Sequence, residues 1–277
     1  MIVPRGQYQG QGPLAVFGCA WHYRQLVLRL TLREIEARFR GSLLGKLWAG
    51  IVPLFMLCLY TFVFGVLLKV RWPGLEGSTL QVALLYFSGL ILFDFVLECL
   101  TRAPALLAEQ ISYVKKVLFP LEILAWVVIG GALFRVLVGS VLLIVFYLAI
   151  DGLPPPSAMA APVLVLPLAL VAIGFIWFLS AVGVYVRDFR HAVLMLAPVT
   201  MFLTPVFFPL STVAEPIRSL LYLNPLTFVI EAVRAALFLG EWPSAPALAI
   251  YTGLAWIFAW AGRSWFLFVR GEFADVV

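Results

Sequence analysis

Two histidines and three cysteines are the side chains of this 277-residue chain best suited to bind a metal or attack a substrate. His22 and His191 lie far apart, so neither a metal-binding spacing such as H-E-x-x-H nor a Ser-His-Asp arrangement is supported. The cysteines are odd in number and scattered, which favours packing roles over disulfides or a metal site. They are Cys19, Cys58 and Cys99. The sequence therefore predicts no catalytic and no metal site.

The stretch GSLLGK, from Gly41 to Lys46, resembles a phosphate-binding loop. That loop requires four residues between its glycines and a Ser or Thr after the lysine. Here only three residues separate Gly41 from Gly45, and Leu47 follows the lysine. We therefore expect this chain to hold no nucleotide and no other cofactor.

Charged side chains inside apolar runs carry more information about function than the histidines, the cysteines or the GSLLGK stretch. Asp94, Glu98 and Arg102 are spaced four residues apart and would share one helix face. Arg135 lies near the middle of another apolar run, where an Arg costs about 2.5–3.5 kcal/mol on insertion scales unless it is paired or hydrated. We predict that Arg135 pairs with Asp94 or Glu98. A purely structural pair is the preferred interpretation, and a role in lining a path is the alternative.

Aromatic residues make up 15% of the chain, and 23 of them are Phe. Rings that face lipid, with Trp and Tyr at the membrane interface, account for most of them. Some are spaced so that they could also line a helix face on which sugars stack without charge. These candidates for lining a path are Tyr60, Phe64, Tyr86, Phe93, Phe202, Phe207 and Phe208.

The composition excludes a soluble fold, because 64% of the residues are hydrophobic and only 12% are charged, against about 25% charged in soluble domains. We expect one membrane domain over residues 1–277, with a cytoplasmic segment 1–46 and a membrane region 47–270. The net charge of +5 reflects the collection of Lys and Arg on the cytoplasmic side rather than a nucleic-acid partner.

Six uncharged or nearly uncharged runs predict an all-α membrane protein with six transmembrane helices. The runs cover residues 47–68, 77–97, 123–150, 163–186, 192–210 and 242–262. With both termini in the cytoplasm, 14 of the 19 basic residues lie on the cytoplasmic side and four lie outside. The polar start of the chain lacks the features of a signal peptide.

Two further segments are too polar or too short to span a membrane. Between residues 24 and 40, apolar and basic residues recur at helical spacing, which predicts an amphipathic helix lying in the cytoplasmic membrane interface. Its apolar stripe consists of Leu28, Leu32, Ile35 and Phe39. Between residues 207 and 242, two short apolar stretches broken at Asn224-Pro225 predict re-entrant or interfacial helices, with a peripheral surface helix as the alternative.

Four motifs in order resemble the permease subunits of type-2 ATP-binding-cassette polysaccharide exporters, which move O-antigen, capsule or teichoic acid. Residues 31–53 read TLREIEARFRGSLLGKLWAGIVP, like the opening of that family, and residues 115–120 read KKVLFP, like its step into the third span. Residues 185–191 read YVRDFRH and residues 223–227 read LNPLT, followed by Glu231 and Arg234. The resemblance covers residues 24–270.

The resemblance implies a homodimer in the bacterial inner membrane that docks on two copies of a separate ATPase subunit, which binds ATP and Mg. It also implies that the loop from Thr101 to Lys116 carries a coupling helix. Its apolar residues would offer a docking face at Leu106, Leu107, Ile111 and Val114, with a solvated connecting helix as the alternative. The residues expected to couple to the ATPase are Glu109, Gln110, Tyr113, Lys115, Lys116, Arg29 and Arg33.

For the substrate, the resemblance implies a lipid-linked polysaccharide whose diphosphate is attracted by Arg38, Arg40 and Lys46 at the cytoplasmic face. Ordinary positive-inside topology is the alternative reason for these basic residues. The expected outer gate comprises Asn224, Pro225, Glu231 and Arg234. Two other functions stay open: a type-2 exporter of lipid, drug or haem, and a membrane glycosyl- or acyltransferase.

Overall fold

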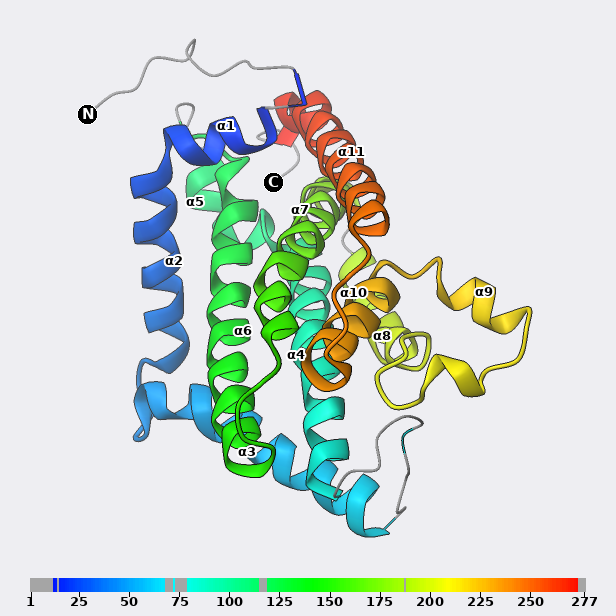
Figure 1. The fold of residues 1–277 in the computed structure, drawn as a ribbon. Helices are drawn as coiled ribbons and strands as arrows, with labels where there is room; N and C mark the ends of the chain where they lie inside the picture. The colour runs from blue at the N-terminus through cyan, green and yellow to red at the C-terminus, as the bar shows by residue number, and fades with distance from the viewer. Residues whose placement is uncertain are drawn as a thin grey trace.

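The computed structural model describes residues 12–13, 15–67, 72, 79–114, 119–186 and 188–273, without the side chain of Lys46. Every regular element in these ranges is a helix, so the expected all-α class is confirmed. The bundle is drawn in Figure 1.

Four described helices are long and apolar enough to cross a membrane. They are α4 (Thr79–Arg102), α6 (Ile123–Ile150), α7 (Ala161–Tyr185) and α11 (Ala245–Val269). The bounds of α6 are those predicted for the third span, because the apolar run ends at charged or polar residues on both sides. α11 extends past the predicted end at residue 262, because Arg263 is buried in the bundle.

The other two predicted spans are shorter apolar helices, so a count of six spans is not confirmed. α3 (Trp48–Tyr60) contains Pro53 and passes into a π-helical turn, η2 (Thr61–Leu67). α8 (Phe189–Phe202) contains Pro198 and ends before Pro205. Proline lacks the amide N–H that an α-helix needs, which shortens or kinks such helices.

The N-terminal segment differs from the prediction. α1 (Ala15–His22) lies across the end of the bundle, whereas α2 (Arg24–Phe39) runs along α6 instead of lying across the helix ends (Figure 1). Thr31 and Ile35 of α2 are buried, while Leu28 and Leu32 of the predicted apolar stripe are exposed. The reason is electrostatic, since ion pairs of Glu34 and Arg38 with α4 turn the polar side of α2 toward the protein.

Most of the loops that the sequence assigned to the cytoplasm lie together at one end of the bundle, but the segment after α2, residues 40–47, lies toward the other end, where α3 begins (Figure 1). The end with most of these loops holds α1, the C-terminal ends of α4 and α11, and the short helices η3 (Ala103–Ala105), η4 (Ala108–Gln110) and α5 (Ile111–Val114). η8 (Arg270–Glu272) follows α11 there. At the opposite end, η5 (Pro156–Ala160) leads from α6 into α7.

The predicted outer segment divides at Asn224-Pro225, as the sequence indicated. Before the break, η6 (Leu210–Thr212) and α9 (Ile217–Leu221) project from the side of the bundle (Figure 1). After it, α10 (Pro225–Arg234) and the π-helical η7 (Ala235–Leu239) pack inside, against α4, α7 and η5. Helices of this length cannot span a bilayer alone, so their polar backbone depends on the protein around them.

The most extensive helix pairing in the described part of the chain lies between α7 and α11, where Gly174 and Gly262 bring the two backbones together. A Cβ atom at Gly262 would lie 2.4 Å from the carbonyl oxygen of Gly174. A Cβ atom at Gly253 of the same helix would meet nothing within 4 Å.

We expect Gly262→Ala to force α7 and α11 apart and to lower the stability of the folded protein by about 1–3 kcal/mol. Thermal unfolding of the purified protein in detergent measures this effect. Gly253→Ala is the matched control and should leave the melting temperature unchanged or raise it. Equal melting temperatures for the two variants would show that the pairing is not tight.

Candidate functional site

A cluster of five charged side chains joins three helices around Glu98. Arg38 from α2, Arg102 from α4 and Arg135 from α6 all pair with its carboxylate, the Arg102 pair at 3.7 Å. The Glu98 side chain is only 6% exposed, so it depends on these partners for the solvation that water would otherwise supply. Of the two partners predicted for Arg135, the structure selects Glu98. Asp94 lies one turn away on α4 and is exposed.

Glu34 completes this group, which we call the Glu98 cluster. Its carboxylate pairs with Arg38 at 3.0 Å and also with Arg102. Sequence reasoning missed Glu34, although its position four residues before Arg38 is the spacing of a helical ion pair. The cluster therefore ties α2 to Arg102, the last residue of α4, after which the predicted coupling loop begins.

Four of the seven predicted path aromatics meet in one aromatic cluster, which Trp72 joins. Phe64 lies 4.5 Å from Tyr86 and 5.1 Å from Phe207 between ring centroids, and Tyr60 lies 5.7 Å from Phe207. Trp72, which the sequence reasoning missed, packs edge-on against Tyr86 at 5.7 Å. The Tyr86 hydroxyl is buried and has no hydrogen-bond partner among the described residues.

The other three predicted path aromatics are not part of this cluster. Phe93 is buried in the apolar core, Phe202 is exposed at the end of α8, and Phe208 is half-buried. Helical spacing alone cannot separate a core ring from a ring that lines a path, because both faces of these helices are apolar.

Arg234, predicted at the outer gate, is a buried anchor for the outer segment. Its guanidinium donates to the carbonyl oxygens of Pro205 and Val206, both at 2.6 Å, and to that of Leu85 on α4 at 3.3 Å. It also pairs with Glu231 at 3.3 Å and lies 4.9 Å from the ring centre of Trp72. These contacts hold the chain after α8 against α4 and against the aromatic cluster.

Asn224 and Pro225 have a structural role at the same place. The Asn224 side-chain oxygen accepts from the amide N–H of Leu226, which caps the first turn of α10, and Pro225 occupies the first helical position. The Asn224 side-chain nitrogen donates to the Leu203 carbonyl at 3.0 Å and to Thr204 at 2.8 Å. The break therefore fixes the start of α10 to the end of α8.

The predicted docking face of the coupling loop is mostly buried. Leu106, Leu107 and Val114 pack into this chain's own core, and only Ile111 is exposed. The reason is that the loop folds back as short helices against α7, where the Pro104 carbonyl would lie 2.1 Å from a Cβ at Gly183. Glu109 is exposed and pairs with Arg190, at the start of α8, at 3.8 Å.

The remaining predicted cytoplasmic residues lie at the surface or outside the described part. Arg29, Arg33 and Arg40 are exposed, and Gln110 and Tyr113 are half-buried, with the Tyr113 ring stacked on Phe119. Lys115 and Lys116 lie outside the described residues, as does the side chain of Lys46. Arg38, predicted to admit the substrate, is instead engaged in the Glu98 cluster.

At the end of the bundle that holds α1, Glu122 receives contacts from three segments. Its carboxylate pairs with Arg270 at 3.0 Å, and its backbone oxygen accepts from the Trp177 ring nitrogen at 3.1 Å. Burial raises the pKa of the neighbouring Cys19 thiol far above its usual value, and the charge of Glu122 raises it further. Cys19 is thus a protonated packing residue, as the sequence indicated.

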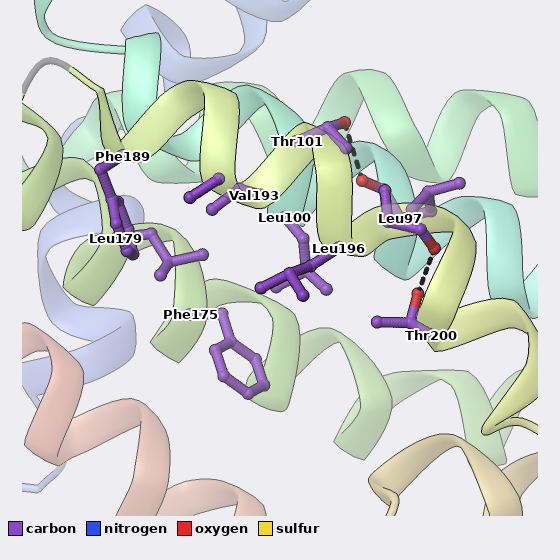
Figure 2. A pocket seen from close by; sticks show the side chains of 11 residues that line it. Leu97, Leu100, Thr101, Phe175, Leu179, Phe189, Val193, Leu196 and Thr200 are labelled. Carbon is purple, nitrogen blue, oxygen red and sulfur yellow. Dashed lines mark hydrogen bonds between the residues drawn. The ribbon is translucent and has the colours of Figure 1, made fainter.

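An apolar groove of about 240 Å³ lies between α4, α7 and α8 (Figure 2). Its two hydroxyl groups are engaged by their own helices, since Thr101 donates to the Leu97 carbonyl and Thr200 to that of Ala197, at 2.8 and 2.7 Å. The groove therefore offers hydrocarbon surface and no group for chemistry. None of the predicted path aromatics lines it.

Four long apolar helices packed into one bundle define a multi-pass membrane protein. The chain belongs to the ABC-2 type transporter family, whose family model matches residues 25–238. This agrees with the resemblance found in the sequence motifs.

Curated relatives of this family resemble the chain over nearly its whole length. It is 29% identical over 259 residues to the O-antigen export system permease protein RfbA of Myxococcus xanthus, covering 93% of this chain and 97% of the relative. Two proteins of the same name from Klebsiella pneumoniae are 22% and 20% identical, each covering 91% of this chain and 95% of the relative.

We expect Arg234→Met to lower the free energy of unfolding by about 3–5 kcal/mol, because it leaves Glu231 and several buried carbonyl groups without their donor. Thermal unfolding in detergent measures the loss. Arg190→Met is the control, because its exposed pair with Glu109 is worth about 0–1 kcal/mol. Similar losses for the two variants would contradict the anchoring role of Arg234.

Proposed function

We propose that this protein is the permease subunit of an exporter that moves lipid-linked, O-antigen-like polysaccharide across the bacterial inner membrane. The observation that carries the proposal is the similarity to the Myxococcus xanthus permease, which spans almost the full length of both chains. The aromatic cluster adds a physical reason, since aromatic faces bind sugar rings without requiring charge.

In this proposal two copies of the chain form the path. Tyr60, Phe64 and Phe207 are only half-buried, so the aromatic cluster keeps an open side that a second copy would cover. α3 and α8 present many exposed apolar side chains, and no residue of α8 is buried in the single chain. Surfaces of this kind face lipid or another protein chain in a membrane protein.

Energy would come from a separate ATPase subunit bound at the cytoplasmic end, in two copies for the dimer. The exposed residues Glu109, Arg29 and Arg33 are the contacts we propose for it, together with Gln110, Tyr113, Lys115 and Lys116. The Glu98 cluster supplies a physical link, because Arg102 both pairs with Glu34 of α2 and precedes the coupling loop directly.

Deleting the gene in its own bacterium should abolish polysaccharide on the cell surface and cause lipid-linked glycan to accumulate in the cytoplasm. Surface polysaccharide is measured by gel or antibody staining, and the lipid-linked form by extraction from spheroplasts. Restoring the gene on a plasmid is the control. Normal surface polysaccharide in the deletion strain would show that the exporter carries another substrate.

We expect Arg40→Glu to reduce export by about tenfold or more, since a charge-assisted contact to a diphosphate contributes about 1.5–3 kcal/mol. Arg40 is exposed just beyond the Glu98 cluster on α2 and is the suitable test of a contact with the diphosphate, because changing Arg38 would also break that cluster. Arg40→Lys, which keeps the charge, is the matched control. Unchanged export by Arg40→Glu, with normal membrane level and ATPase binding, would contradict this role.

A further inference from the structure

Two charged side chains are open to the surroundings at a depth where lipid cannot solvate them. The Arg135 side chain is 48% exposed, and Asp94 on the neighbouring helix is exposed as well. At 1.5 Å per residue, Arg135 lies about 18 Å from the start of α6 and Asp94 about 12 Å from the end of α4. A hydrocarbon core is about 30 Å thick, so both residues lie near its middle.

Arg135 cannot relieve this cost by extending toward the membrane surface. Its guanidinium is held by Glu98, which lies inside the bundle one turn along α4 from Asp94. Charged groups inside membranes face a water-filled cavity or other protein groups rather than lipid. The open side of α4 and α6 near Asp94 and Arg135 is therefore not a lipid-facing surface.

The opposite side of α6 provides a direct comparison within the same helix. Leu137, about 200° around the helix from Arg135, is 62% exposed, and Val141, Ile144 and Leu148 continue this exposed apolar surface. These side chains have the composition of a lipid-facing surface. α6 thus has one exposed apolar side and one exposed charged side, which indicates two different surroundings.

The charges near this face balance. Arg38, Arg102 and Arg135 supply three guanidinium groups, and Glu34, Glu98 and Asp94 supply three carboxylates. A balanced set of donors and acceptors matches uncharged hydroxyl groups better than a strongly anionic head group. α3, which carries Tyr60 of the aromatic cluster, packs against both α4 and α6, so a surface for stacking sugar rings adjoins these polar groups.

We propose that the face of α4 and α6 carrying Asp94 and Arg135 lines a water-filled path and hydrogen-bonds hydroxyl groups of the polysaccharide as it passes. The identity of the ligand rests on the proposed function, whereas the water-filled path rests on the exposed charges alone. Glu98 is the positioning residue, because it holds the Arg135 guanidinium at this face.

The path is tested by thiol labelling of the complete transporter in membrane vesicles, after the native cysteines at positions 19, 58 and 99 are replaced by Ala. Asp94→Cys and Val138→Cys place thiols on the charged side, and Val138→Cys leaves all six charges intact. Leu137→Cys is the matched control on the apolar side. A charged, membrane-impermeant thiosulfonate should label the first two at least about tenfold faster, because the reactive thiolate forms where water solvates it.

Two results would overturn the water-filled path. One is that the charged reagent fails to label Asp94→Cys and Val138→Cys although a hydrophobic maleimide labels both, which would mean that lipid or a second copy covers this face. The other is equal labelling of Leu137→Cys and Val138→Cys, which would place the whole of α6 in water.

A second measurement tests the ligand. Labelling of Val138→Cys is compared between cells that make the lipid-linked polysaccharide and cells that cannot, both with an inactive ATPase so that the glycan is retained. Slower labelling in the first strain supports contact with the glycan. Equal labelling in the two strains overturns the contact with the glycan. The proposed export function is then unaffected, because it is tested separately by the loss of surface polysaccharide in the deletion strain.

Discussion

The buried carboxylate of Glu98 is the interaction on which the arrangement of the helices depends. A guanidinium from each of α2, α4 and α6 reaches it, and a buried charge of this kind is tolerated only when it is paired and hydrogen-bonded. The three helices must therefore stay in register around one side chain. This requirement explains why α2 lies along α6, with Leu28 and Leu32 exposed, instead of resting on its apolar stripe.

Arg234 has the corresponding role toward the other end of the bundle. A single buried guanidinium joins α10, α4 and the segment after α8, and it packs over Trp72 of the aromatic cluster. The aromatic rings thus lie beside one rigid anchor, while Glu98 fixes the charged face on the same helix α4. The ion pairs of Arg102 also connect the Glu98 cluster to the loop that follows α4.

Sequence patterns were most successful for features that depend on the residues of a single segment. The bounds of α6 and the break at Asn224-Pro225 follow from local hydropathy and from proline, and both are present. Sequence patterns were less successful at predicting features that depend on contact with a second segment of the chain. The apolar residues of the coupling loop suggested a docking face, yet Leu107 and Val114 pack into the chain's own core, because hydropathy indicates burial without indicating against what. The sequence analysis missed Trp72 because its partners are distant in sequence, and it missed Glu34 because the Arg102 that joins Glu34 to the cluster lies on another helix.

By itself, the sequence determined that this is a membrane protein, which segments are apolar enough to be helices in it, and which family its motifs resemble. Each of these follows from composition and order, since lipid requires long uncharged helices whatever their neighbours are. Only the tertiary structure decided that Arg135 pairs with Glu98 rather than Asp94, which of seven aromatic rings meet, and which side of α2 faces the protein. Those outcomes depend on contacts between segments many residues apart, and a side chain's partner is set by the packing of whole helices rather than by its own sequence neighbourhood.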